Sequence, residues 1–298
     1  MTRAERRNLR NGLLFISPWL LGFVVFDIYP LVASMYYSFT DYNVLQAPVW
    51  IGTGNYEDLW QDARFWTALW NTVYFTAISV PMCLMASILI AVLLNMKLPG
   101  MTIFRTIFFL PSIVPIVASA VLWLWVFNPD SGLVNSLLHQ FLGDDFPAPG
   151  WLASETWSKP SLIIMSVWGI GAAVVVFLAG LNEVPQTLYE VADLDGAGIW
   201  HKFRHVTLPM LTPTILFNLI MGLIASFQYF TQVYVMTLGR GTPLDSTLFY
   251  ALYLYRVSFY YLRMGYGSAM AWILFVVILV STLGVLLSSR KWVYYQGE

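Results

Sequence analysis

The sequence predicts an all-α polytopic membrane protein with six transmembrane helices. Hydrophobic residues make up 58% of the 298 residues and charged residues only 10%, against about 25% charged residues in an average soluble chain. With a mean hydropathy of +0.67, such a chain cannot cover itself with a polar surface. The composition argues against a soluble enzyme, and the net charge of -1 argues against a nucleic-acid binder. A single cysteine, Cys83, excludes an internal disulfide framework.

Six long apolar segments predict the six spans. A helix needs about 20 apolar residues to cross the hydrocarbon layer, and each segment reaches that length. Their apolar residues occur in continuous runs and not in alternation, which favours helices over the strands of a barrel. The expected spans are about 13–37, 67–96, 106–128, 160–182, 209–238 and 264–289.

The basic residues predict the orientation of these spans. With the N-terminus inside, ten of the 15 Lys and Arg residues lie on the inner side, and inner loops are enriched in these residues. We therefore expect both termini in the cytoplasm. The ten are Arg3, Arg6, Arg7, Arg10, Lys97, Arg105, Lys202, Arg204, Arg290 and Lys291.

Two further features lie outside the regular pattern of spans. The longest outer loop, 128–159, contains an amphipathic stretch at 133–142 that predicts a short surface helix. Asp27 is the only acid inside the first span, where an ionised side chain is costly. Snorkelling to the interface or pairing with another helix explains it better than a role in transport.

The segment 183–208 concentrates charge between two uncharged spans and predicts a docking surface. Pro185 suits the first turn of a helix, and Leu188, Val191 and Ala192 follow at helical spacing. Gly196 and Gly198 end that helix, and a second helical pattern begins after them. The sequence predicts helix, glycine turn and helix, held at the cytoplasmic surface.

The same segment resembles the EAA loop of ABC importer permeases. Glu190-Val191-Ala192, three residues, Gly196, nine residues and then Val206-x-Leu208-Pro209 follow that family's spacing, with Val191 and Val206 as conservative departures. The longer pattern, with Asp195 and Ala197, resembles the carbohydrate-uptake type that serves maltose, multiple sugars or glycerol phosphate. The resemblance implies that the ATPase-coupling residues are Glu190, Val191, Ala192, Asp195, Gly196, Ala197, Leu208 and Pro209.

The resemblance also implies the rest of a type I importer in a bacterial or archaeal inner membrane. The implied partners are a second homologous permease chain, two ABC ATPase subunits, an extracytoplasmic solute-binding protein and a sugar substrate, with no nucleic acid. The chain lacks the G-x-x-x-x-G-K-[ST] loop that cradles phosphates. We therefore expect a non-catalytic subunit with no metal and no cofactor, and ATP and Mg used by the ATPase subunits. The segment 239–243 departs from the family's usual Thr-x-Gly-Gly-Pro pattern.

Candidate residues of the substrate path lie in the two spans on either side of the loop. Sugars present hydroxyls and flat apolar faces, so their path combines amides or hydroxyls with aromatic and small residues. By that mixture, and by counting from Glu190 to the positions used in the maltose-type permease, the path residues are Trp168, Gly169, Gly222, Ser226, Gln228 and Tyr229. Alternatively, Ser226 and Gln228 hold helices together.

A self-sufficient six-span carrier or channel driven by an ion gradient is the alternative function. It predicts charged pairs within the spans or an inverted repeat. The sequence shows the lone Asp27 and no repeat, which favours the importer subunit.

Overall fold

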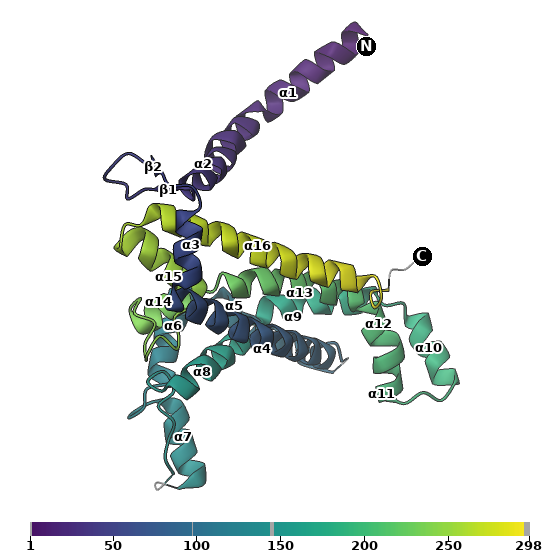
Figure 1. The fold of residues 1–298 in the computed structure, drawn as a ribbon. Coiled ribbons are helices and arrows are strands. Elements are labelled where there is room, and N and C mark those ends of the chain that lie inside the picture. The colour runs from purple at the N-terminus through teal and green to yellow at the C-terminus, as the bar shows by residue number, and fades with distance from the viewer. Residues whose placement is uncertain (1, 97, 144–145, 295–298) are drawn as a thin grey trace. The chain divides into compact units, whose positions relative to one another are not determined.

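The computed structural model describes residues 2–96, 98–143 and 146–294 as a helical chain with one short β-ribbon (Figure 1). The described chain divides into two compact units. The first contains Met1–Asp62 and Leu254–Ile273, and the second contains Ala63–Tyr253 and Leu274–Glu298. The helices α15 (Tyr250–Tyr255) and α16 (Met264–Ser289) each run from one unit into the other.

The first unit begins with a long continuous helical rod. Its elements in order are α1 (Arg3–Phe23), the π-helical η1 (Val24–Ile28), α2 (Tyr29–Tyr37), β1 (Thr40–Asp41), β2 (Val49–Trp50), α3 (Gly54–Gln61) and η3 (Arg256–Tyr260). Asp27 lies in η1 and is exposed. The strands pair antiparallel with Thr40 opposite Trp50. Buried Asn55 fixes this region, because its Nδ2 donates to the carbonyls of Ser38 and Thr40, each at 2.9 Å.

The second unit is built around the long helix α4 (Ala63–Leu94), which packs against α8, α9 and α13. Its other elements are α5 (Met101–Ile113), α6 (Ile116–Val126), α7 (Leu133–Leu142), α8 (Glu155–Trp168), α9 (Gly171–Glu183), α10 (Gln186–Leu194), α11 (Ile199–Lys202), η2 (Phe203–Thr207), α12 (Leu208–Met210), α13 (Thr212–Phe227) and α14 (Thr231–Thr237). The helix α7 covers the amphipathic stretch that the sequence predicts. The core cluster of the second unit is apolar and consists of Ala91, Leu94, Ile170, Val174, Phe177, Leu178, Leu181 and Leu211.

The helical fold class predicted from the sequence is confirmed, and the number of candidate spans agrees with it. In the described residues, four helices are long and apolar enough to cross a membrane: Arg3–Tyr37, Ala63–Leu94, Thr212–Thr237 and Met264–Ser289. Two bent pairs, α5 with α6 and α8 with α9, raise the count to six if each pair is one span.

Three of the expected spans differ from continuous helices. The segment 106–128 is bent by 100° between α5 and α6, and 160–182 by 47° between α8 and α9. Proline explains the first break: Pro115 cannot continue a helix from Val114, whose ψ of 128° is extended. The segment 209–238 is interrupted at 228–230, between α13 and α14.

Candidate functional site

The three helix breaks of the second unit meet at one cavity of about 610 Å³. Val114 from the first break, Gly169 and Ile170 from the second, and Gln228 to Phe230 from the third all line it. Non-helical backbone within a membrane is tolerated where it is buried in protein or faces a water-filled cavity. The breaks are therefore expected in an aqueous path and would be costly against lipid.

All six substrate-path residues predicted from the sequence line this cavity. They come from two stretches of chain: Trp168 and Gly169 at the end of α8, and Gly222, Ser226, Gln228 and Tyr229 in and directly after α13. The structure therefore brings the predicted set together. Contact with a substrate stays a prediction for each of them.

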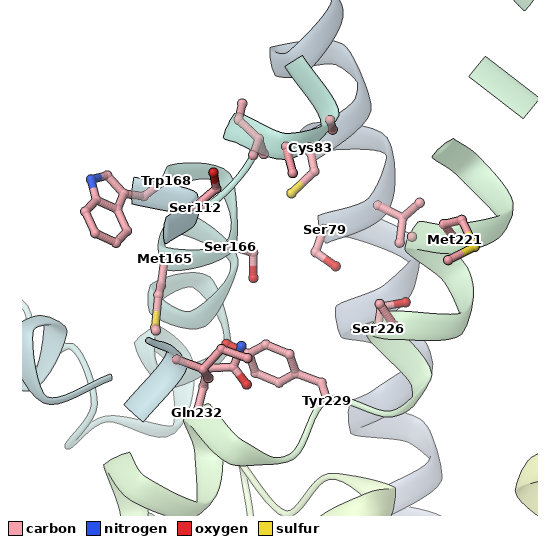
Figure 2. A pocket seen from close by; sticks show the side chains of 18 of the residues that line it. Ser79, Cys83, Ser112, Met165, Ser166, Trp168, Met221, Ser226, Tyr229 and Gln232 are labelled. Carbon is pink, nitrogen blue, oxygen red and sulfur yellow. The ribbon is translucent and has the colours of Figure 1, made fainter. Parts of the chain in front are cut away.

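The wall of the cavity is uncharged and mostly apolar, with serine hydroxyls and amides set among the apolar side chains. Figure 2 shows Ser79 of α4 and Ser166 of α8 on opposite sides of the space, with Tyr229 closing one end. Tyr229 packs its ring against Phe75 at a centroid distance of 4.5 Å. No Asp, Glu, Lys or Arg is found among the lining residues that the structure describes. A cavity of this size and composition suits a neutral, hydroxyl-rich solute.

Two predicted residues have a more specific geometry. The Ser226 hydroxyl donates to the Leu223 carbonyl of its own helix at 3.0 Å, so this bond joins no second helix. The Trp168 ring is turned away from Ser79 and Tyr229 in Figure 2 and meets Trp123 edge-on, with centroids 6.0 Å apart. Its contribution to the cavity is at the rim.

The sequence analysis missed the wall that α4 contributes. Phe75, Ser79, Cys83 and Ser87 all line the cavity and recur every four residues, so they lie on one face of the helix. Small polar residues at this spacing inside an apolar span were the signal that could have found them.

The segment after α9 folds as the predicted helix, glycine turn and helix. The helix α10 ends in a Schellman motif: Gly196 N donates to Asp193 O at 3.0 Å, and Ala197 N donates to Ala192 O at 2.8 Å. Gly196 has φ +74°, the left-handed conformation that glycine adopts at little cost. The turn thereby reverses the chain from α10 toward α11.

Side-chain contacts hold the two arms of this turn together. The Tyr189 and Thr207 hydroxyls are hydrogen-bonded at 2.9 Å, and Lys202 forms an ion pair with Asp193. Glu190 is exposed. Figure 1 shows α10 and α11 as two neighbouring short helices.

Apolar side chains nevertheless point outward from the turn. Leu194 and Ile199 are each 88% exposed and Trp200 is 66% exposed. Exposed apolar groups ringed by both signs of charge are typical of a surface that binds another protein. We call the segment Glu190–Pro209 the coupling segment below, and the roles of its residues stay predictions.

A helical membrane protein that has a cavity between its helices and an exposed helical turn with apolar side chains has the organisation of a transporter permease subunit. A family profile described as the inner membrane component of binding-protein-dependent transport systems matches residues 83–293, and the chain belongs to this family. It is a transport subunit and not an enzyme. The alternative of a self-sufficient, ion-gradient-driven carrier is not favoured.

Individual relatives agree with the family. The chain is 40% identical to the probable ABC transporter permease protein YesP of Bacillus subtilis, covering 100% of this chain and 96% of the relative. It is 37% identical to the lactose transport system permease protein LacF of Rhizobium radiobacter, covering 93% and 92%. A crystal structure of a bacterial alginate ABC transporter, in complex with its alginate pentasaccharide-bound periplasmic protein, contains a similar chain. Its TM-score is 0.84 at 25% identity, covering 97% of this chain and 98% of that one.

Proposed function

We propose that this chain forms part of the translocation path of an ATP-driven sugar importer in a bacterial or archaeal inner membrane. A binding protein would deliver the sugar outside the cell, and a second homologous permease chain would complete the path. The observation that carries the proposal is the uncharged cavity, whose wall combines serine hydroxyls, amides and aromatic rings. The lactose and alginate relatives support a carbohydrate as the solute.

We further infer that the importer contains two ABC ATPase subunits and that one of them docks on the coupling segment of this chain. Its exposed Leu194, Ile199 and Trp200 supply apolar contact area, and Glu190 supplies a charge for a basic residue of the ATPase. In this proposal ATP and Mg bind the ATPase subunits, and this chain holds no cofactor. Both termini would lie in the cytoplasm, on the same side as the ATPases.

The connectivity gives the docked ATPase a route to the cavity. The helix α9 starts at the cavity, where Ala172 and Ala173 line the wall, and it leads to α10. The helix α13 leaves the coupling segment and returns to the cavity through Gly222 and Ser226. A movement of the segment would therefore shift two of the cavity's walls together. Such a shift would open the path to one side of the membrane at a time.

A charge reversal tests the coupling role. Glu190→Lys places like charges at the proposed contact, which is strongly unfavourable at a buried interface. We expect this variant to reach normal membrane levels and keep its partner permease, but to lose the ATPase and sugar uptake. Asp130→Lys is the matched control, because this acid is also exposed but lies in the expected outer loop 128–159, away from the predicted docking surface. Normal uptake with bound ATPase in the Glu190 variant would reject the proposed docking.

Uptake into proteoliposomes with a sugar panel tests the substrate class. The uncharged wall predicts transport of neutral oligosaccharides, because a fixed charge on the solute would find no opposite charge among the described lining residues. Selective uptake of amino acids or inorganic ions by the reconstituted transporter would reject a carbohydrate substrate.

A further inference from the structure

A second cavity, of about 310 Å³, lies between α5, α9 and the end of α4 and shares no lining residue with the central one. One face of α9 forms its longest wall: Gly171, Val174, Val175, Leu178, Ala179 and Asn182. These residues span 11 helical steps, which corresponds to a groove roughly 16 Å long. Phe109 and Arg105, one turn apart on α5, form the opposite wall.

The groove is apolar at one end and polar at the other. At the apolar end Gly171 lets α9 touch the backbone of α5, since a Cβ there would lie 2.6 Å from the Phe108 carbonyl oxygen. At the polar end Arg105 donates from Nε and Nη2 to the Leu94 carbonyl, at 3.3 and 3.0 Å. Leu94 is the last residue of α4, so its carbonyl is one of those that a helix leaves without an internal partner.

The positive charge of Arg105 is not neutralised by the groove. A guanidinium has five N–H donors, and the Leu94 carbonyl, which accepts two of them, is neutral. No Asp or Glu belongs to the described lining of the groove. The neighbouring walls are apolar, and a charge beside low-dielectric surface attracts an anion more strongly than the same charge in water.

The two ends of the groove lie at the membrane depths of a lipid head group and of its acyl chain. Arg105 directly precedes the apolar segment 106–128, and Asn182 ends the segment 160–182. The polar end therefore lies at the level of head groups, and the groove leads from there into the hydrocarbon layer. Basic pockets between membrane helices are typical sites for anionic lipid head groups.

We propose that this groove binds one anionic phospholipid, with its phosphate on the Arg105 guanidinium and an acyl chain along α5 and α9. An anionic head group has no ammonium of its own to compete with Arg105, so it binds in preference to a zwitterionic one. A bound chain would also brace α9, the helix that leads into the coupling segment. The bracing of α9 rests on the proposed function, whereas lipid binding in the groove does not.

Lipid retention by the purified transporter tests the site without requiring transport. The complex is incubated with phosphatidylglycerol or phosphatidylcholine of identical acyl chains, and the bound lipid is quantified by native mass spectrometry. Arg105→Gln removes the charge, and we expect about a tenfold loss of bound phosphatidylglycerol, the order of magnitude of one hydrogen bond to a charged group. Arg290→Gln is the matched control, because it removes an exposed arginine outside the groove and should retain the lipid.

Ala179→Trp tests the apolar part independently. Ala179 is exposed within the groove, so an indole there occupies the path of the acyl chain and leaves Arg105 and its bond to Leu94 in place. We expect it to lose the lipid as Arg105→Gln does, and inorganic phosphate not to displace the lipid from the wild type. Equal retention of both lipids by the wild type, undiminished retention by either groove variant, or displacement by phosphate would overturn the proposal.

Discussion

The two glycines of the coupling segment allow a controlled test of its turn. Gly196 has φ +74°, whereas Gly198 has φ -68° and ψ 169°, a conformation open to any residue. A Cβ added at either position meets no atom within 4 Å. Gly196→Ala and Gly198→Ala therefore add the same methyl group to open space, and only the backbone conformation distinguishes them.

The expected magnitude follows from this difference in conformation. An L-residue such as alanine in the left-handed region costs about 1–2 kcal/mol, and the extended region carries no such penalty. If the ATPase binds the coupling segment only when residue 196 is in the left-handed conformation, the strain of that conformation weakens docking by the same free energy. A penalty of this size corresponds to an association weaker by about 5- to 30-fold. Gly198→Ala should stay within about twofold, as is usual for a surface substitution.

The measurement is a titration of purified ATPase against the permease complex in nanodiscs, with sugar uptake recorded in parallel. Gly196→Asn provides a graded third point, because asparagine tolerates the left-handed conformation better than alanine. We expect the order wild type, Asn and Ala in decreasing affinity. Equal affinities of the Gly196→Ala and Gly198→Ala variants would refute the link between the turn and docking.

Three other predictions follow from the fold and the cavity. Asn71→Leu leaves the Asp245 and Leu248 carbonyls without the Nδ2 bonds of 2.9 and 3.1 Å, so the free energy of unfolding should fall by about 1–3 kcal/mol. A lower melting temperature in detergent is the readout, and an unchanged one would contradict the bonds' role. Gly222→Phe has room at Cβ, 3.4 Å from Val80, but places its ring in the cavity. Sugar uptake should be lost while the variant reaches normal membrane levels, and wild-type uptake would argue against a sugar path past Gly222. Reporter fusions at both ends of the chain should report the cytoplasm, because the Lys and Arg excess lies on that side; an outside signal from either end would reverse the predicted topology.

Local patterns predicted the features that depend on neighbouring residues. Gly196 and the periodic Leu188 and Val191 indicated the helix α10 and the turn after it, because capping and amphipathicity act within a few residues. The bend between α5 and α6 was not predicted, although its cause is local, since Pro115 acts on the adjacent Val114. The residue types and the family resemblance, and not periodicity, supplied the substrate-path positions that the structure brings together at the cavity.

Features that depend on distant segments could not be predicted in this way. The glycine at 171 is required by the Phe108 backbone, which belongs to a different helix. The break at 228–230 contains no proline or glycine, so no local signal marks it. The spacing of Ser79, Cys83 and Ser87 marks one face of α4, but which helices this face meets depends on the packing of α8 and α13 beside it.

The helix α9 links three features that the sequence presents separately. Ala172 and Ala173 of its first turn line the central cavity, Val175 and Ala179 line the second groove, and Phe177 is fully buried in the core. Its last residue, Glu183, is followed within three residues by α10. Because close-packed helices shift as rigid units and do not deform smoothly, a displacement imposed through α10 cannot stop at the end of α9. It must change the cavity wall and the groove together, which makes α9 the element through which the proposed ATPase, solute and lipid sites would influence one another.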